Sequence, residues 1–292
     1  MALEAGSRAA QFDKWWNFAS TIVAPATLLS SLLFYFGYVF SRSQYRYFGL
    51  DVDTVGLSTQ DYVMRSPQAL LVPLLVISLG GAGLLLTHLF LRRHPPPARV
   101  VRSMLALSVV ALLAGLVLVV GFAALGGWPP YALVTPMLLA AGSAGFLYTS
   151  RLPGAPAFLI PADEEGRGLR RGALVFALVA IVGCLFWATA TVAQWTALGN
   201  AMRTARNLDE LAPVILDTKE RLFLTDGIVK ETALPSGEGD DFRYRYRGLR
   251  VLIQGRDALF LVPERWSPSD STLMVPLDGS VRVQFRFVDR AP

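Results

Sequence analysis

Five long apolar stretches, none containing Asp, Glu, Lys or Arg, constrain this chain of 292 residues more than any other feature. They cover approximately residues 19–40, 69–91, 103–125, 131–148 and 173–195. A helix needs roughly 20 apolar residues to cross about 30 Å of hydrocarbon, and each stretch reaches or approaches that length. Soluble domains of this size alternate apolar and polar positions instead. The sequence therefore predicts an integral membrane protein with five transmembrane helices, embedded in a lipid bilayer.

The distribution of basic residues predicts how the chain threads the membrane. Ten Lys and Arg lie before the first stretch and in the loops that follow the second and fourth, against three in the other two loops. Short cytoplasmic loops carry an excess of Lys and Arg. We therefore expect a plasma-membrane protein with a cytoplasmic N-terminal lead, residues 1–18, and an extracytoplasmic C-terminal region. The ratio of 24 Arg to 3 Lys points to a bacterial genome rich in G and C.

The chain beyond the fifth stretch changes its pattern from helical spacing to strand alternation. We expect a five-helix domain over 19–195, a helical extension over 196–212 that Pro213 ends, and a small all-β extracytoplasmic domain over 213–292, a sandwich or barrel. Six strands are predicted, at residues 214–224, 228–234, 242–254, 258–262, 272–275 and 280–287. Asp278-Gly279 predicts a two-residue hairpin between the last two strands.

The loop between the first two stretches, residues 41–68, is long and rich in aromatic residues. Ser58 and Asp61 have the spacing of a capping box, in which each residue satisfies a backbone N–H of the other. This spacing predicts a short helix over 59–65 that ends before Pro67 and the second stretch. Its Tyr62 is expected to lie against the membrane or against the C-terminal domain.

The residues that carry most enzyme chemistry are scarce in this sequence. The two histidines are His88 and His94, the single cysteine is Cys184, and none of them lies in the C-terminal domain. A Ser-His-Asp or Cys-His site there is excluded, and no cluster for zinc exists. No phosphate-binding glycine motif is present. We therefore expect a non-enzymatic protein without cofactor or metal.

Neither the net positive charge nor the acidic cluster of the C-terminal domain indicates a ligand. Residues 196–292 carry 14 basic and 14 acidic residues, so the net charge of +5 arises in the membrane part and indicates topology. Glu238, Asp240 and Asp241 lack the ligand spacing of a calcium loop and are expected to form a solvated turn.

A basic strip in the C-terminal domain is the one candidate binding site. Residues 242–247 alternate aromatic and Arg strictly, so a strand would place Arg243, Arg245 and Arg247 on one face, extended by Arg250. This strip could be a solvated face that docks internally onto Glu231, Asp257, Glu264, Asp51 or Asp53. It could instead bind anionic lipid headgroups, an anionic polymer of the cell envelope or an acidic protein partner.

Two functional hypotheses follow. In the first, the β domain and the 41–68 loop bind a partner in envelope assembly, sensing or regulation. In the second, the transmembrane helices form an oligomeric channel or carrier. Small residues such as Ala141 and Gly145, four apart on one helix face, permit either close packing within the chain or a homo-oligomeric seam. No motif is specific enough to name a family.

Overall fold

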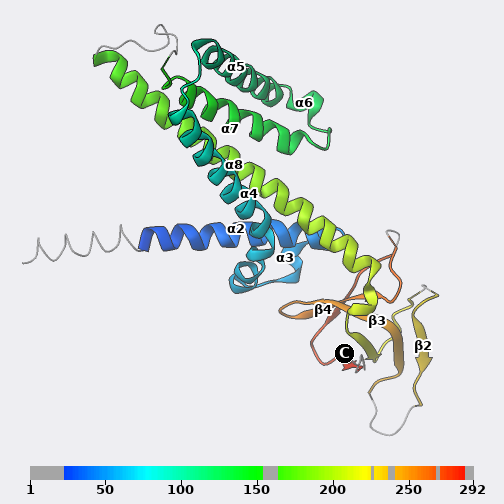
Figure 1. The fold of residues 1–292 in the computed structure, drawn as a ribbon. Coiled ribbons are helices and arrows are strands. Elements are labelled where there is room, and N and C mark those ends of the chain that lie inside the picture. Colours follow the sequence, from blue (N-terminus) through cyan, green and yellow to red (C-terminus); the bar gives the residue numbers. More distant parts are fainter. Residues whose placement is uncertain (1–22, 154–163, 225–226, 236–240, 268–269, 287–292) are drawn as a thin grey trace, which may run out of the picture. The chain divides into compact units, whose positions relative to one another are not determined.

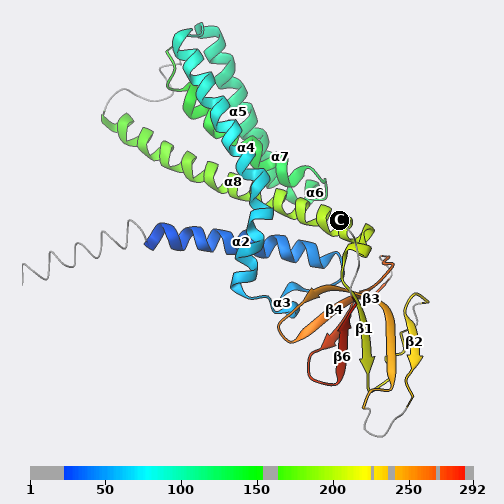
Figure 2. The same cartoon turned by 60° about the horizontal axis from the view of Figure 1, so that its bottom comes forward.

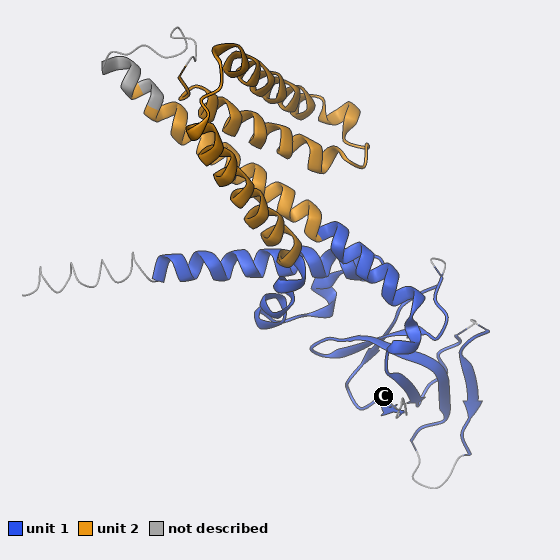
Figure 3. Cartoon of the chain, viewed as in Figure 1, with its two compact units in different colours: residues 1–69, 194–292 blue, residues 70–193 orange. Residues whose placement is uncertain are grey.

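The structure is a computed structural model and describes residues 23–153, 164–224, 227–235, 241–267 and 270–286. The chain forms two compact units, coloured separately in Figure 3. Unit 1 comprises residues 1–69 and 194–292, and unit 2 comprises residues 70–193. Unit 1 therefore joins two parts of the chain that lie far apart in sequence. The predicted domain limits at 1–18, 19–195, 196–212 and 213–292 stay predictions.

Five helices of the described residues are long and apolar enough to cross a membrane (Figure 1). They are α2 (Ala24–Arg46), α4 (Thr59–Arg93), α5 (Ala98–Val120), α7 (Tyr131–Thr149) and α8 (Glu164–Arg206). The prediction of five long apolar helices is confirmed. The 19–40 stretch begins outside the described residues and continues in α2. The N-terminal lead and the acidic pair Glu238 and Asp240 also lie outside them.

Helix α4 runs without interruption through Pro67, so the predicted break before this residue is wrong. A proline inside a helix cannot donate to the carbonyl four residues earlier, which here belongs to Val63. The hydroxyl of Ser66 donates to that Val63 oxygen at 2.7 Å and satisfies it instead. The predicted capping box is confirmed, because the Ser58 N–H donates to Asp61 Oδ2 at 2.8 Å and the Asp61 N–H donates to Ser58 Oγ at 3.2 Å.

The third apolar stretch forms two helices, α5 and the short α6 (Phe122–Leu125), separated by Gly121. Glycine stabilises a helix least of all residues except proline, which explains the break at this position. Within unit 2, α5 packs closely against α7. A Cβ at Gly142 would lie 2.7 Å from the backbone nitrogen of Leu112, so only glycine permits this approach. Ala141 is exposed, and the close contact is made by Gly142 and Gly145 rather than by Ala141 and Gly145.

Six antiparallel strands form one sheet in unit 1, which confirms a separate all-β region (Figure 2). They are β1 (Pro213–Thr218), β2 (Lys230–Ala233), β3 (Tyr244–Gln254), β4 (Ala258–Pro263), β5 (Leu273–Pro276) and β6 (Val281–Phe285). The order is β5-β4-β3-β1-β6, and β2 pairs with the first half of β3. The choice between a sandwich and a barrel stays a prediction.

The long strand β3 changes its neighbour at Gly248. Residues 244–247 pair with β2, and residues 249–254 pair with β4. Gly248 has φ +90°, and a Cβ there would lie 2.8 Å from the carbonyl oxygen of Ile228. Glycine alone adopts this conformation at low cost. The next residue, Leu249, again faces the main core, where it packs with Tyr246, Leu259 and Leu261.

Strand β4 is buried on both faces, although a strand of an antiparallel sheet often has one solvated face. Leu259 and Leu261 point into the core between the strands. Phe260 points the other way, into a cluster with Tyr45, Val52, Val55 and Tyr62 of the 41–68 segment. The expected contact between Tyr62 and the C-terminal domain is therefore present.

The end of α8 covers the same face of β4 further along the strand. Val262 packs with Phe48, Ala201 and Leu208. Helix α8 ends at Arg206 and is followed by a short 3₁₀ turn, η3 (Leu208–Glu210), so the helix stops before Pro213 rather than at it. The helical spacing of Ala201 and Leu208 thus matches their burial against β4.

The predicted hairpin at Asp278-Gly279 is wrong. Among the described residues, β5 pairs with β4 and β6 pairs with β1, so the strands that flank this turn lie at opposite ends of the strand order. The turn itself forms, because Asp278 Oδ1 accepts from the Ser280 N–H at 2.9 Å and Gly279 has φ +79°. Local turn chemistry cannot specify which strands pair, since the pairing depends on the whole sheet.

Replacing Phe260 by Ala should detach the 41–68 segment from the sheet. Phe260 is 1% exposed, and truncating a buried Phe costs about 3 kcal/mol or more. Hydrogen–deuterium exchange on the full chain in micelles should show faster exchange in residues 52–62 and in β4. Phe285→Ala is the matched control, because Phe285 is 63% exposed, and equal exchange in both variants would contradict the docking.

Candidate anion-binding face

Strand register gathers basic side chains on the face of the sheet opposite the main core. Lys230 pairs with Arg247, and Arg245 pairs with Asp217, which pairs in turn with Arg282. Paired residues share a face, and residues two apart on a strand do so as well. We call Lys230, Arg245, Arg247 and Arg282, together with the exposed Arg243 that lies one residue before β3, the basic face. The described register places one carboxylate among them, that of Asp217.

The basic face continues the surface that the 41–68 segment and the end of α8 cover. Arg250 pairs with Val262 on β4, and Val262 lies beneath Phe48 and Ala201. The β4 end of this sheet face is therefore buried. At the other end, Lys230, Arg243 and Arg247 are exposed, and no ion pair is described for any of them. The 41–68 segment and the end of α8 therefore cover only the part of this sheet face that lacks the exposed basic residues.

Asp217 lies at the centre of the basic face and is fully buried. Arg245 donates from Nε to Oδ1 at 2.7 Å and from Nη2 to Oδ2 at 2.9 Å, a bidentate pair. Arg282 donates from Nε and Nη2 to Oδ2 at 3.1 and 2.8 Å. Its guanidinium also lies 4.8 Å from the centre of the Phe242 ring. Two guanidinium groups are thus fixed around one carboxylate.

Hydrogen bonds from Arg245 lower the pKa of the Asp217 carboxyl below its ordinary value. Burial of the carboxylate acts in the opposite direction, and the bonds from Arg282 lower the pKa further. The same pairing raises the pKa of Arg245. The pairing therefore favours the charged forms of both Asp217 and Arg245.

The structure gives the four residues of the predicted strip different surroundings. Arg243 and Arg247 are exposed, whereas Arg245 is bound to Asp217. Arg250 donates from Nη1 to the carbonyl oxygens of Asp209 and Leu211 at 3.0 and 2.8 Å, and its Nη2 lies 3.6 Å from Glu264 Oε1. Arg250 thus holds the turn after α8 against β3, which agrees with the internal docking considered above. Anion binding by the four residues stays a prediction.

Sequence reasoning missed Lys230, Asp217 and Arg282 as members of this face. The alternation of residues 280–286 placed Arg282 on the polar side of its strand, which was a usable signal. Nothing in the sequence showed that β6 and β3 both flank β1, because that order depends on long-range pairing.

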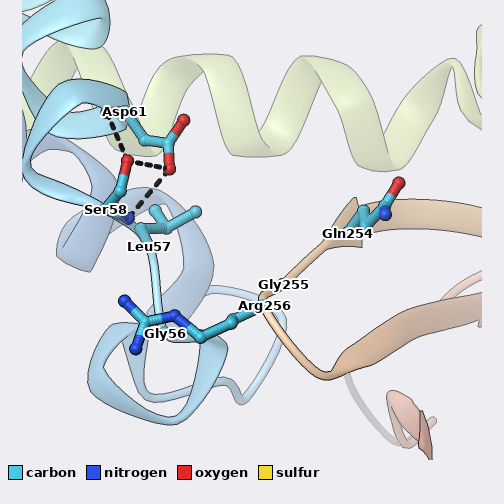
Figure 4. Close-up of a pocket in the computed structure, with 7 residues that line it drawn as sticks. All are labelled: Gly56, Leu57, Ser58, Asp61, Gln254, Gly255 and Arg256. Atoms are coloured by element: carbon cyan, nitrogen blue, oxygen red, sulfur yellow. Dashed lines mark hydrogen bonds between the residues drawn. The ribbon is translucent and has the colours of Figure 1, made fainter. Parts of the chain in front are cut away.

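A small cleft in unit 1 is the other candidate, with a volume of about 380 Å³ (Figure 4). It is lined by Gly56, Leu57, Ser58, Asp61, Gln254, Gly255 and Arg256. Asp61 Oδ2 already accepts from the backbone N–H and the hydroxyl of Ser58. The side chains of Asp61 and Arg256 do not point toward each other in Figure 4. The cleft therefore lacks the convergent polar groups that define a ligand site.

His88, His94 and Cys184 belong to unit 2, whereas the basic face belongs to unit 1. In the described ranges, no group of three or more His, Cys, Asp and Glu side chains is placed to hold a metal ion. His88 Nδ1 lies 3.1 Å from the hydroxyl of Tyr148 within unit 2, and Cys184 is buried.

Comparisons with family models, with curated proteins and with solved structures give no match.

Replacing Asp217 by Asn should destabilise the sheet at neutral pH and weaken its response to acid. The Asp217 pKa is depressed in the folded state, so its stabilisation is present above the unfolded pKa of about 3.9 and is lost as pH falls through the folded value. At pH 7 the variant should lose about 2 kcal/mol, because both Arg side chains lose a charged acceptor.

Hydrogen exchange of β1 and β6, corrected for intrinsic rates, measures this effect. In the natural protein these strands should open more as pH falls below about 4, whereas Asp217→Asn should already be loose at pH 7. Asp241→Asn is the control, since Asp241 pairs with Lys219 at the surface with a side chain 75% exposed. An acid response that survives Asp217→Asn would contradict the assignment.

Proposed function

We propose that this chain is a multi-pass plasma-membrane protein that acts by binding rather than by catalysis. In this proposal the N-terminus is cytoplasmic, five helices cross the bilayer, and the β-sheet of unit 1 lies outside the cytoplasm with the 41–68 segment. The basic face binds an acidic partner, which is a protein or a polyanion of the cell envelope. The observation that carries the proposal is the set of five cations around one buried carboxylate on a bare sheet face.

The lengths and compositions of the helices support the membrane part of the proposal. Each of the five contains an apolar segment of 18 residues with at most two charged side chains. Helix α8 has 43 residues and is therefore about 65 Å long, roughly twice the thickness of the hydrocarbon layer. Its last turns leave the apolar region and pack in unit 1, where Ala201 is buried against β4. The excess of basic residues in alternate loops supports the orientation.

The charge distribution supports an acidic partner. Residues 196–292 are neutral overall, yet among the described residues the strand register places one carboxylate, that of Asp217, beside the cations of the basic face. Like charges on neighbouring strands destabilise a sheet by themselves. Lys230 and Arg247 are directly opposite each other on β2 and β3, and both are exposed. An anionic partner would relieve this repulsion, which makes binding rather than stability the better explanation for the pair.

The orientation predicts the behaviour of reporters fused after Pro292. Alkaline phosphatase, which needs an oxidising compartment, should be active there, and a cytoplasmic reporter should be inactive. A fusion in the loop after α4, at Pro96, should give the opposite pair of activities. An active cytoplasmic reporter after Pro292 would reverse the proposed topology.

Removing exposed charge from the basic face should weaken partner binding. We expect Arg243→Gln/Arg247→Gln to lower the recovery of crosslinked partners from intact cells. The affinity for the partner should fall about fivefold for each charge lost. Arg245 is left in place because its removal would leave the buried Asp217 with Arg282 as its one described charged partner.

Arg221→Gln is the matched control on the opposite face. Arg221 pairs with Glu231 at 2.7 Å, and Glu231 lies beside Tyr246 of the main core. Recovery should be unchanged in this variant, and membrane expression should be equal in all three proteins. Full recovery by Arg243→Gln/Arg247→Gln would remove the basic face from the proposed function.

A further inference from the structure

We propose that Asp217 positions Arg245 and Arg282 as a paired guanidinium site for a phosphate group. This inference rests on the proposed function, since it names the chemistry that the basic face recognises. It adds a role for a buried acidic residue in binding an anion, and it assigns the centre of the site to three strands, β3, β1 and β6.

The argument begins with the hydrogen bonds that Asp217 uses and those that it leaves. Each guanidinium group carries five N–H donors in a planar fork. Arg245 and Arg282 both turn the edge formed by Nε and Nη2 toward Asp217. On each residue the two N–H bonds of Nη1 have no described acceptor. Both guanidinium groups therefore keep donors for a ligand while one edge is held by the carboxylate.

The two groups are held in place before any ligand arrives. The side chain of Asp217 is 0% exposed, that of Arg245 is 24% exposed and that of Arg282 is 43% exposed. The carboxylate is thus inaccessible, whereas the guanidinium groups reach the surface. The ring of Phe242 packs against one face of the Arg282 guanidinium group. Ordering a long side chain in advance reduces the entropic cost of binding.

The local charge favours an anion over a neutral ligand. Two guanidinium groups and one carboxylate leave one positive charge, and Arg247 and Lys230 in the adjacent row add two more. Arg247 lies two residues from Arg245 on the same face of β3, at a spacing of about 7 Å. A phosphate group can therefore contact the fixed pair while its neighbours in a polymer or membrane contact the second row.

The geometry suits a phosphate group. Asp217 shows that one oxyanion can accept from both guanidinium groups, since Oδ1 and Oδ2 are bound to Arg245 and Oδ2 is also bound to Arg282. Arg245 and Arg282 come from strands on opposite sides of β1, so a ligand above Asp217 must accept from two directions. A tetrahedral phosphate offers oxygens to both groups. The phosphate can belong to a dissolved polyphosphate or to a phospholipid headgroup, and the same chemistry serves either source.

The test uses the full chain in nanodiscs and two probes that separate the sources. In neutral phosphatidylcholine discs, soluble polyphosphate is titrated and binding is followed by thermophoresis. In discs that also contain phosphatidylglycerol, hydrogen exchange of β1 and β6 reports contact with headgroups. A response in only one arm, binding by thermophoresis or protection from exchange, identifies the source of the phosphate. A response in either arm supports a phosphate site. Absence of both responses in the natural protein would overturn the inference.

Arg282→Lys is the decisive variant, because it keeps the charge and removes the fork. We expect phosphate binding to weaken about tenfold. Arg221→Lys, the same change on the opposite face, should leave binding unchanged. Asp217→Asn raises the net charge by one and should nevertheless weaken binding, because Arg245 and Arg282 lose their common anchor. Hydrogen exchange of β3 in each variant checks that the sheet is folded.

The outcomes separate this inference from the proposed function. If binding depends on charge alone, Arg282→Lys will bind as well as the natural protein and Asp217→Asn will bind more tightly, and the paired site is wrong. Arg247→Gln should still weaken binding in that case, and the basic face keeps its function. If the natural protein captures partners in cells but binds neither probe, the partner is not recognised through phosphate and this inference alone falls.

Discussion

The burial of β4 on both faces is the constraint on which the rest of unit 1 depends. One face supplies Leu259 and Leu261 to the core between the strands, and the other supplies Phe260 and Val262 to the 41–68 segment and the end of α8. A strand with only one apolar face would leave the sheet attached through the single connection at Pro213. Because six consecutive residues of β4 are buried, two distant parts of the chain are joined in one compact unit.

The same sheet face carries both the attachment and the candidate site. Near β4 it is apolar and covered, and near β2 and β6 it is basic and bare. Arg250 lies between these regions and binds the backbone after α8 through its guanidinium group. Apolar residues of similar volume often stabilise a sheet as well as a buried carboxylate with two Arg partners does. In the proposed site, the role of Asp217 is to orient Arg245 and Arg282.

Much of the architecture followed from patterns that are local in sequence. Long apolar stretches predicted five helices, and alternation with turn signals predicted six strands that overlap the observed ones, although the first ends at Thr218 rather than at residue 224. The capping box at Ser58 was also predictable, because its two hydrogen bonds join residues three apart. Predictions failed where a local signal was overruled by its surroundings. Pro67 does not end α4 because Ser66 satisfies the carbonyl of Val63, and Asp278-Gly279 does not form a hairpin because its flanking strands pair elsewhere.

The sequence by itself determined which segments are apolar, which alternate, and that Arg245 and Arg247 share one side of a strand. These properties depend only on the helical and strand periods. The tertiary structure alone decided that β1 separates β3 from β6, and so that Asp217 holds Arg245 and Arg282 together. It also decided that Arg250 binds internally. The physical reason is that strand order arises from pairing and packing across the whole sheet, which joins residues 28 and 65 positions apart in the chain.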